Sequence, residues 1–269
     1  MPIPVPCLCY NVDSDPVIAC GLEYSEVQLD EAIEGPVKDL LLDTAGTAEL
    51  NELLSGLSTT DFEPELIEEL LQTSPEPEDW LVGEALAEAY VADNDDCIFP
   101  WPTSRDLKNP EASPAGADLT GFQEVDDEES PYRFAFGEVK TSSDQNYPPN
   151  VMYGRTGLKN QLEGLRESYP TKQSLILYLG HHALNAPWQH MFESATKRFL
   201  RSEYTDIAIF GVLIRDVAPN EDDLSYRASA LSKNCPPATS ISLYAIYLPT
   251  DSISSLSAKS VAALQGGEQ

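Results

Sequence analysis

Apolar positions along the chain recur with two periods, and the period of two marks the expected strands. Segments 117–125 and 132–142 alternate apolar residues with small or polar ones, and the acidic turn DDEESP separates them. Two alternating runs joined by a polar turn predict an antiparallel hairpin. Continuous apolar runs are typical of strands buried on both faces. Further strands are expected at 5–12, 17–25, 97–99, 174–180, 206–214 and 241–248.

Helices are expected where apolar residues recur every three or four positions. The clearest is 78–93, a run of strong helix formers that carries Glu84 and Glu88 one turn apart on one face. The other expected helices are 37–57, 62–72, 157–169 and 188–204. Helices interspersed with strands predict an α/β fold, with a mixed central β-sheet flanked by helices.

The segment TSPEPEDW, residues 73–80, combines two prolines with three acids and is the best candidate for a domain boundary. We therefore expect an acidic N-terminal segment over 1–78, a main domain over 79–250 and a C-terminal tail over 251–269. The tail is rich in Ser and Ala, and its last residues are expected to fray.

The net charge of −29 is unevenly distributed. The first 100 residues hold 24 acids and one base, Lys38, whereas the other 169 hold 21 acids and 15 bases. Between Arg133 and Arg201 there are nine bases and five acids. Nucleic acid should therefore be repelled by the chain as a whole but not by that segment. The acidic front, residues 1–100, is either a solvated surface, a docking surface for a basic partner or a shield over the DNA-facing side.

The five cysteines are scattered and lack zinc-site spacing, so they are expected to be reduced thiols in a cytoplasmic protein. There is no run of 18 apolar residues and no basic region typical of a signal peptide at the start. A cytoplasmic location is the expectation.

The stretch FAFGEVKTSS, residues 134–143, ends an apolar strand with Glu138 and Lys140 on one face. Asp118 opens the paired strand, so the hairpin would bring it to the same end of the sheet. Two adjacent carboxylates repel each other unless a divalent cation neutralises them, and oxygen ligands suit Mg²⁺ or Mn²⁺. A lysine there can orient a water or stabilise charge on a phosphate. These residues predict metal-dependent phosphodiester hydrolysis; the alternative is a structural Glu–Lys ion pair.

Asp118 in GADLTGF, followed by FGEVKTS, resembles the signature of the PD-(D/E)xK, or restriction-endonuclease-like, nuclease superfamily. The resemblance covers roughly residues 79–216 and implies a core of a helix, a three-strand meander, a helix and a strand. Two features depart from it: Ala117 stands where the signature has Pro, and only DCIFP is available for the first meander strand.

The resemblance also implies a role for each matching position. It assigns metal binding to Glu84, Asp118, Glu138 and the Val139 carbonyl, catalysis to Asp118, Glu138 and Lys140, and an auxiliary polar role to Gln161. The implied cofactor is Mg²⁺, with Mn²⁺ as a substitute.

Three blocks, VGEALAEAYV, FPWPTSRDLKNPEASPAGADLTGF and FAFGEVKTSS, together resemble the HamA nuclease subunits of the bacterial Hachiman antiphage defence system. That resemblance implies a DNA endonuclease of low sequence specificity. It also implies a heteromeric complex with a HamB-like superfamily 2 DNA helicase, which restrains the nuclease. Two other hypotheses remain open: a catalytically weak nuclease-fold adaptor, and an acidic DNA mimic that inhibits a DNA-binding protein.

Basic residues on two expected helices are candidates for contacts with the DNA backbone, although an ordinary solvated face explains them equally well. The first group is Arg155, Lys159 and Arg166, and the second is Lys197, Arg198 and Arg201. Arg105 is a further candidate for a phosphate contact.

Several other residues belong to types that are common in functional sites, but their sequence surroundings do not indicate a site. A second acid-x-Lys triplet, Asp106 to Lys108, has no strand around it and is treated as a decoy. His181, His182 and His190 have no identifiable partner for a nucleophilic or zinc site, so we expect surface or core-edge histidines.

Overall fold

A seven-stranded sheet forms the centre of the protein. The computed structural model describes residues 1–56, 66–67, 71, 77–102, 105 and 116–265. The strand order is β1-β2-β7-β6-β5-β4-β3. The four central strands, β2, β7, β6 and β5, pair in parallel, whereas β1 at one edge and β4 and β3 at the other pair antiparallel to their neighbours. The strands are β1 Cys7–Asn11, β2 Ile18–Glu23, β3 Cys97–Ile98, β4 Leu119–Glu124, β5 Tyr132–Ser142, β6 Ile207–Arg215 and β7 Ser240–Tyr247.

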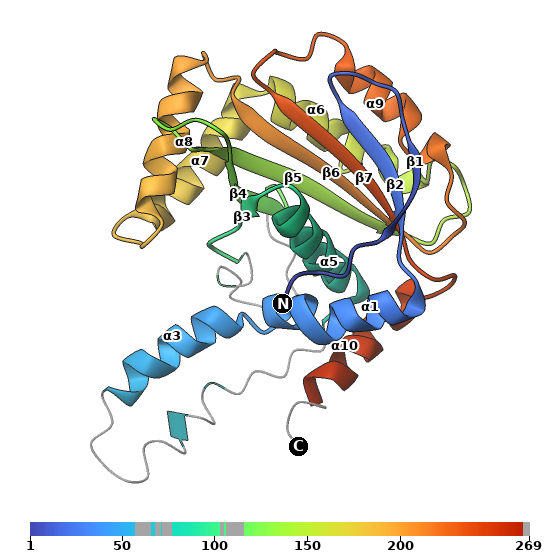
Figure 1. Cartoon of the computed structure of the whole chain (residues 1–269), viewed down its shortest axis with the longest axis horizontal. Coiled ribbons are helices and arrows are strands. Elements are labelled where there is room, and N and C mark those ends of the chain that lie inside the picture. Colours follow the sequence, from blue (N-terminus) through green and yellow to red (C-terminus); the bar gives the residue numbers. More distant parts are fainter. Residues whose placement is uncertain (57–65, 68–70, 72–76, 103–104, 106–115, 266–269) are drawn as a thin grey trace.

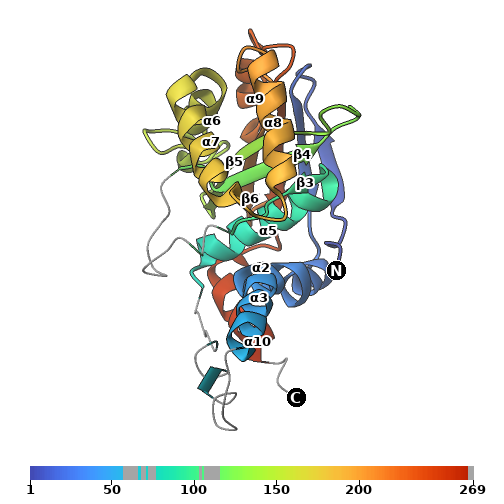
Figure 2. The same cartoon turned by 90° about the vertical axis from the view of Figure 1, so that its left-hand side faces the viewer.

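Helices cover both faces of the sheet, as Figures 1 and 2 show. Helix α5 crosses one face, with α1, α2 and α10 packed beyond it; α6 to α9 cover the other. The helices are α1 Glu26–Ala32, α2 Lys38–Leu41, α3 Thr44–Ser55, α5 Asp79–Asn94, α6 Leu158–Glu167, α7 Tyr169–Ala183, α8 Gln189–Arg201, α9 Ser225–Ser232 and α10 Leu256–Gln265. The predicted α/β class, a mixed sheet flanked by helices, is confirmed.

Strand β5 contributes to both cores through the alternation of its side chains. Phe134 and Phe136 pack with the helices α6 to α9, whereas Ala135 and Val139 pack against α5. By the same alternation, Glu138 lies on the face of Phe134 and Phe136, at the end of an apolar strand. The predicted hairpin of β4 and β5 is present, with Leu119 paired to Gly137 and Glu124 to Tyr132.

The expected strand at 174–180 is wrong, because this segment lies inside helix α7. Ser168 caps the helix by accepting a hydrogen bond from the Thr171 amide at 3.3 Å. Leu175 and Leu179, one turn apart, are both buried in the core between the sheet and helices α6 to α9. A short apolar run fits a buried strand and a helix equally well, and the capping residue decides between them.

The expected boundaries at residues 78 and 250 do not separate independent parts. Strand β2 from the acidic front pairs with β7 from Ile18 to Glu23, inside the same sheet. The predicted tail holds helix α10, whose Lys259 makes a 2.5 Å ion pair with Asp30 of α1. Both ends of the chain therefore pack onto the main domain. The expected helix over 62–72 lies almost wholly outside the described residues.

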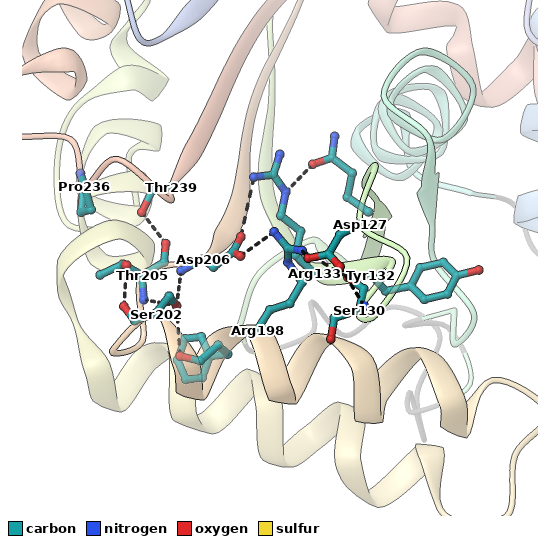
Figure 3. Close-up of polar contacts among 12 residues, drawn as sticks. Asp127, Ser130, Tyr132, Arg133, Arg198, Ser202, Thr205, Asp206, Pro236 and Thr239 are labelled. Carbon is teal, nitrogen blue, oxygen red and sulfur yellow. Dashed lines mark hydrogen bonds and ion pairs between the residues drawn. The ribbon is translucent and has the colours of Figure 1, made fainter.

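One predicted DNA-binding face is in part a structural ion network (Figure 3). Arg198 of α8 binds Asp127 in the hairpin turn at 2.7 Å and Asp206 before β6 at 2.8 Å. Arg133 of β5 lies 3.8 Å from the other oxygen of Asp206. Arg198 thus points inward and joins α8 to the sheet, which corrects its assignment as a candidate for the DNA backbone. Lys197 beside it is exposed.

Replacing Arg198 with Ala should lower the free energy of unfolding by about 1–3 kcal/mol, because it leaves the buried Asp206 with only a distant cation. The matched change Lys197→Ala should stay within about 0.5 kcal/mol of the wild type, since that side chain is exposed. Urea unfolding followed by circular dichroism measures both. Equal stability of the two variants would show that the network contributes nothing.

No helix in the described ranges is long and apolar enough to cross a membrane.

Candidate functional site

The β4–β5 register places two carboxylates at one end of the sheet. Leu119 is paired with Gly137, so Asp118, one residue earlier, lies opposite Glu138. The Asp118 Oδ2 accepts a hydrogen bond from the Val139 amide at 2.8 Å. Strand β4 begins at the next residue, Leu119, and the Asp118 carboxylate takes the place of a backbone partner of β5. The sequence prediction that Asp118 and Glu138 meet is confirmed in geometry.

Glu138 is buried, with 2% of its surface exposed, and Lys140 is its ion-pair partner. The Lys140 Nζ donates to the Glu138 Oε1 at 2.5 Å, and about a quarter of the lysine side chain remains exposed, 23%. Lys140 therefore connects a buried carboxylate to solvent. Burial, then the nearby charge of Asp118, raises the pKa of Glu138 to about 8 despite the lysine.

Glu84 lies on α5 and adds a third acid to the same electrostatic environment. Burial, followed by the charges of Asp118 and Glu138, raises the pKa of Glu84 to about 8, while Lys140 acts in the opposite sense. Burial also raises the pKa of Asp118, although its hydrogen bond from Val139 opposes the effect. In the described part of the chain, three acids thus share the charge of one lysine at this site.

The backbone adds one oxygen to the donor set. In a strand, the N–H and C=O of a residue point toward the same neighbouring strand. Because the Val139 N–H points toward Asp118, its carbonyl is directed to the same edge of β5, beyond the end of β4. Two carboxylates and a carbonyl are hard oxygen ligands, which fit Mg²⁺ or Mn²⁺ by their chemistry.

The described residues do not form a metal site in which three acidic, thiol or imidazole side chains enclose the ion. Among the described residues, no group of three or more His, Cys, Asp or Glu side chains is arranged to hold a metal ion. Glu84 is therefore near Asp118 and Glu138 in electrostatic terms but is not gathered with them into a three-carboxylate ligand group. Its predicted role as a direct ligand stays a prediction.

Gln161 sits on the helix that covers the same face of the sheet as Glu138. Its neighbour Leu162 packs over Gly211, where an added Cβ would come within 2.7 Å of the leucine. Gly211 pairs with Glu138 in the β5–β6 ladder. The Gln161 Oε1 is buried and has no hydrogen-bond partner among the described residues. Buried amide oxygens are usually satisfied, so this atom is an open acceptor in the layer over the site.

The predicted DNA-backbone cations divide into two kinds. Arg155 is exposed and Lys159 is half-buried, so both remain candidates. Arg166 is not, because its Nη1 donates to the carbonyls of Leu231 at 2.9 Å and Lys233 at 3.2 Å. It binds the end of α9, and 11% of its side chain is exposed. The assignment of Arg166 to DNA is therefore corrected to a structural role.

Arg105 also has a protein partner. Its Nε and Nη2 bind the two oxygens of Asp43 at 2.6 and 2.7 Å, and its guanidinium lies 5.0 Å from the centre of the Trp101 ring. This bidentate pair joins the loop after β3 to the start of α3. The decoy triplet at 106–108 lies outside the described residues.

Sequence reasoning missed the environment of Glu88, one turn beyond Glu84 on α5. Burial, together with the charge of Asp43, raises the pKa of Glu88 to about 7. The sequence placed Glu88 on the same face as Glu84, but it held no signal for Asp43, which lies far from it along the chain. The acidic character of α5 therefore extends away from the site.

Comparison of the chain with models of known protein families and with curated proteins gives no match.

Proposed function

We propose that the protein is a metal-dependent DNA endonuclease of the PD-(D/E)xK type, with its active site at the end of β5. The observation that carries the proposal is a buried cluster of three acids, Asp118, Glu138 and Glu84, which share the charge of one base, Lys140. Burying carboxylates is costly unless a cation accompanies them. The elements α5, β3–β4–β5, α6 and β6 follow one another in the order of the core that the sequence resemblance implies, with the additional helices α7 and α8 inserted between α6 and β6.

A structural ion pair explains the site less well. A pair that closes a strand end needs one acid and one base, whereas three acids surround the single lysine here. Here the pKa of Glu138 is raised to about 8 although Lys140 is bonded to it. Raised carboxylate pKa values at a partly open position are typical of functional sites.

Asp118, Glu138 and the Val139 carbonyl would hold the Mg²⁺ or Mn²⁺ ion, which supplies Lewis-acid polarisation of the scissile phosphate when bound. Glu84 adds negative charge beside them and so strengthens the attraction for a cation. Lys140 is placed to donate a hydrogen bond to the incoming water or to a non-bridging phosphate oxygen. Hydrolysis then joins the water oxygen to phosphorus, and the bond to the leaving sugar oxygen breaks.

We further propose that a partner delivers DNA to this site, and that the partner is a superfamily 2 DNA helicase of a bacterial antiphage defence complex. A chain of net charge −29 is repelled by DNA, so it needs another protein for recruitment. Helix α3 supports the proposal: it has no buried residue, exposes Leu50 and Leu53, and extends away from the body in Figure 1.

The test is cleavage of supercoiled plasmid in Mg²⁺ by the purified chain, alone and with the helicase. Wild type should nick or linearise the plasmid, and Glu138→Ala/Lys140→Ala should lose the activity at least about 100-fold, because the charge-stabilising groups are gone. EDTA should stop the wild type. Equal cleavage by both proteins would mean a contaminant. Cleavage by neither, with the helicase present, would favour the adaptor or the DNA mimic.

A further inference from the structure

Helix α5 and strand β5 approach each other closely beside the proposed site. A Cβ built at Gly83 would lie 2.4 Å from the Thr141 Oγ1 and 3.6 Å from the Thr141 Cβ. Gly83 precedes Glu84, and Thr141 follows Lys140. The contact therefore joins the two elements at the residues next to the acid on the helix and the lysine on the strand.

The backbone at Gly83 does not itself require glycine. Gly83 is interior to α5, and it does not have the positive φ that distinguishes Gly116 and Gly154. Alanine is the better helix former at such a position. Ala87, one turn further along the same side of the helix, is also small and buried. What excludes alanine at 83 is the space occupied by the Thr141 hydroxyl.

From this contact we infer that Gly83 is a positioning residue, which sets the distance of Glu84 from the Asp118–Glu138 pair and so tunes the affinity of the site for a divalent cation. The inference rests on the proposed function. An added methyl group would push the start of α5 away from β5. Because Glu84 is the next residue, its carboxylate would move away from the pair, and its contribution to cation attraction would weaken as charge separation grows.

The clash between the new methyl group and the Thr141 hydroxyl can also be removed by changing Thr141. Thr141→Ala deletes the Oγ1 atom and keeps the Cβ, which would then meet the new Cβ of Gly83→Ala at about the 3.6 Å of ordinary van der Waals contact. A double variant, Gly83→Ala/Thr141→Ala, should therefore restore the helix position. Gly164→Ala is the matched control, since it makes the same change inside α6, where no atom lies within 4 Å of the built Cβ.

The experiment is calorimetric titration of the full chain with Mn²⁺ alone, combined with thermal unfolding of each variant. Gly83→Ala should lower the melting temperature and weaken Mn²⁺ binding roughly 10-fold, as changes to groups that orient metal ligands do. The double variant should recover both values, with Mn²⁺ affinity within about 2-fold of the wild type by the same measure. Gly164→Ala should bind like the wild type.

Two results would overturn the inference, and they are distinguishable. If wild type binds Mn²⁺ and Gly83→Ala binds it equally well, the positioning role is wrong while the proposed function stands. The role is also wrong if the double variant regains its melting temperature but not its affinity. If the folded wild type binds no Mn²⁺, the proposed metal site itself fails, and the positioning role fails with it.

Discussion

Glu138→Gln is expected to abolish DNA cleavage while leaving the chain as stable as the wild type at pH 5 and more stable at pH 8.5. The amide keeps the shape of the side chain but removes a buried negative charge that lies near Asp118 and Glu84. A residue that is needed for activity and harmful to stability is a functional residue, not a structural one.

The pH dependence follows from proton binding. An ordinary glutamate loses its proton near pH 4.5, whereas Glu138 in the folded chain keeps it to about pH 8. Between these values the folded state binds more protons than the unfolded state, so wild-type stability falls as the pH rises. Glu138→Gln does not titrate and escapes this loss. Its advantage should grow across this window to the order of several kcal/mol, since one pKa unit corresponds to about 1.4 kcal/mol, and then level off.

Urea unfolding at pH 5, 6.5 and 8.5 measures the effect. Glu128→Gln is the matched control, because Glu128 is exposed in the turn between β4 and β5. That control should show no gain over the wild type at any pH. If Glu138→Gln is instead less stable than the wild type at pH 8.5, the pair with Lys140 is structural, and the functional reading of the site is wrong.

The largest loss of stability is expected from Arg215→Ala. Arg215 is fully buried at the end of β6, where its Nε lies 3.3 Å from Asp223. Its guanidinium also donates to the carbonyls of Ser142 at 3.3 Å and Asn146 at 2.9 Å, in the loop that follows β5. Removing the arginine leaves the buried Asp223 carboxylate without its cation. Breaking such a pair costs about 3–5 kcal/mol.

A double variant separates the charge effect from simple loss of packing. Arg215→Met/Asp223→Asn removes both charges and keeps an acceptor for the Tyr247 hydroxyl, which lies 2.8 Å from Asp223. It should recover at least half of the lost stability, because neutral replacements of buried pairs are well tolerated. Arg155→Ala, at an exposed arginine, is the control. The melting temperature of Arg215→Ala should fall by roughly 6–20 °C; a fall as small as that of the control would contradict the account.

The local parts of this structure could be predicted from the sequence because their signals are local. The alternation in 132–142 and the polar turn before it fixed the hairpin, and the hairpin alone brings Asp118 to Glu138. The strong helix formers of 78–93 gave α5 and placed Glu84 on it. The approach of Gly83 to Thr141 could not be foreseen, because it depends on how closely the helix packs on the sheet.

Errors arose where a distant partner decides the outcome. Arg166 and Arg198 looked like surface cations, yet their partners at Leu231 and Asp127 lie 65 and 71 residues away. The acidic front looked separate, but pairing of β2 with β7 joins it to the sheet. Helix propensity and periodicity carry no information about such contacts. A run of basic residues in the sequence therefore predicts a solvated face only where the fold brings no carboxylate or carbonyl partner to one of them.

The most direct measurement is plasmid cleavage by wild type, Glu138→Gln and Glu128→Gln in Mg²⁺, with the helicase present and with EDTA as a blank. The account predicts cleavage by wild type and Glu128→Gln, and a loss on the order of 100-fold to 1,000-fold in Glu138→Gln although that variant is fully folded. Cleavage by Glu138→Gln at the wild-type rate would contradict the assignment of the active site to the end of β5.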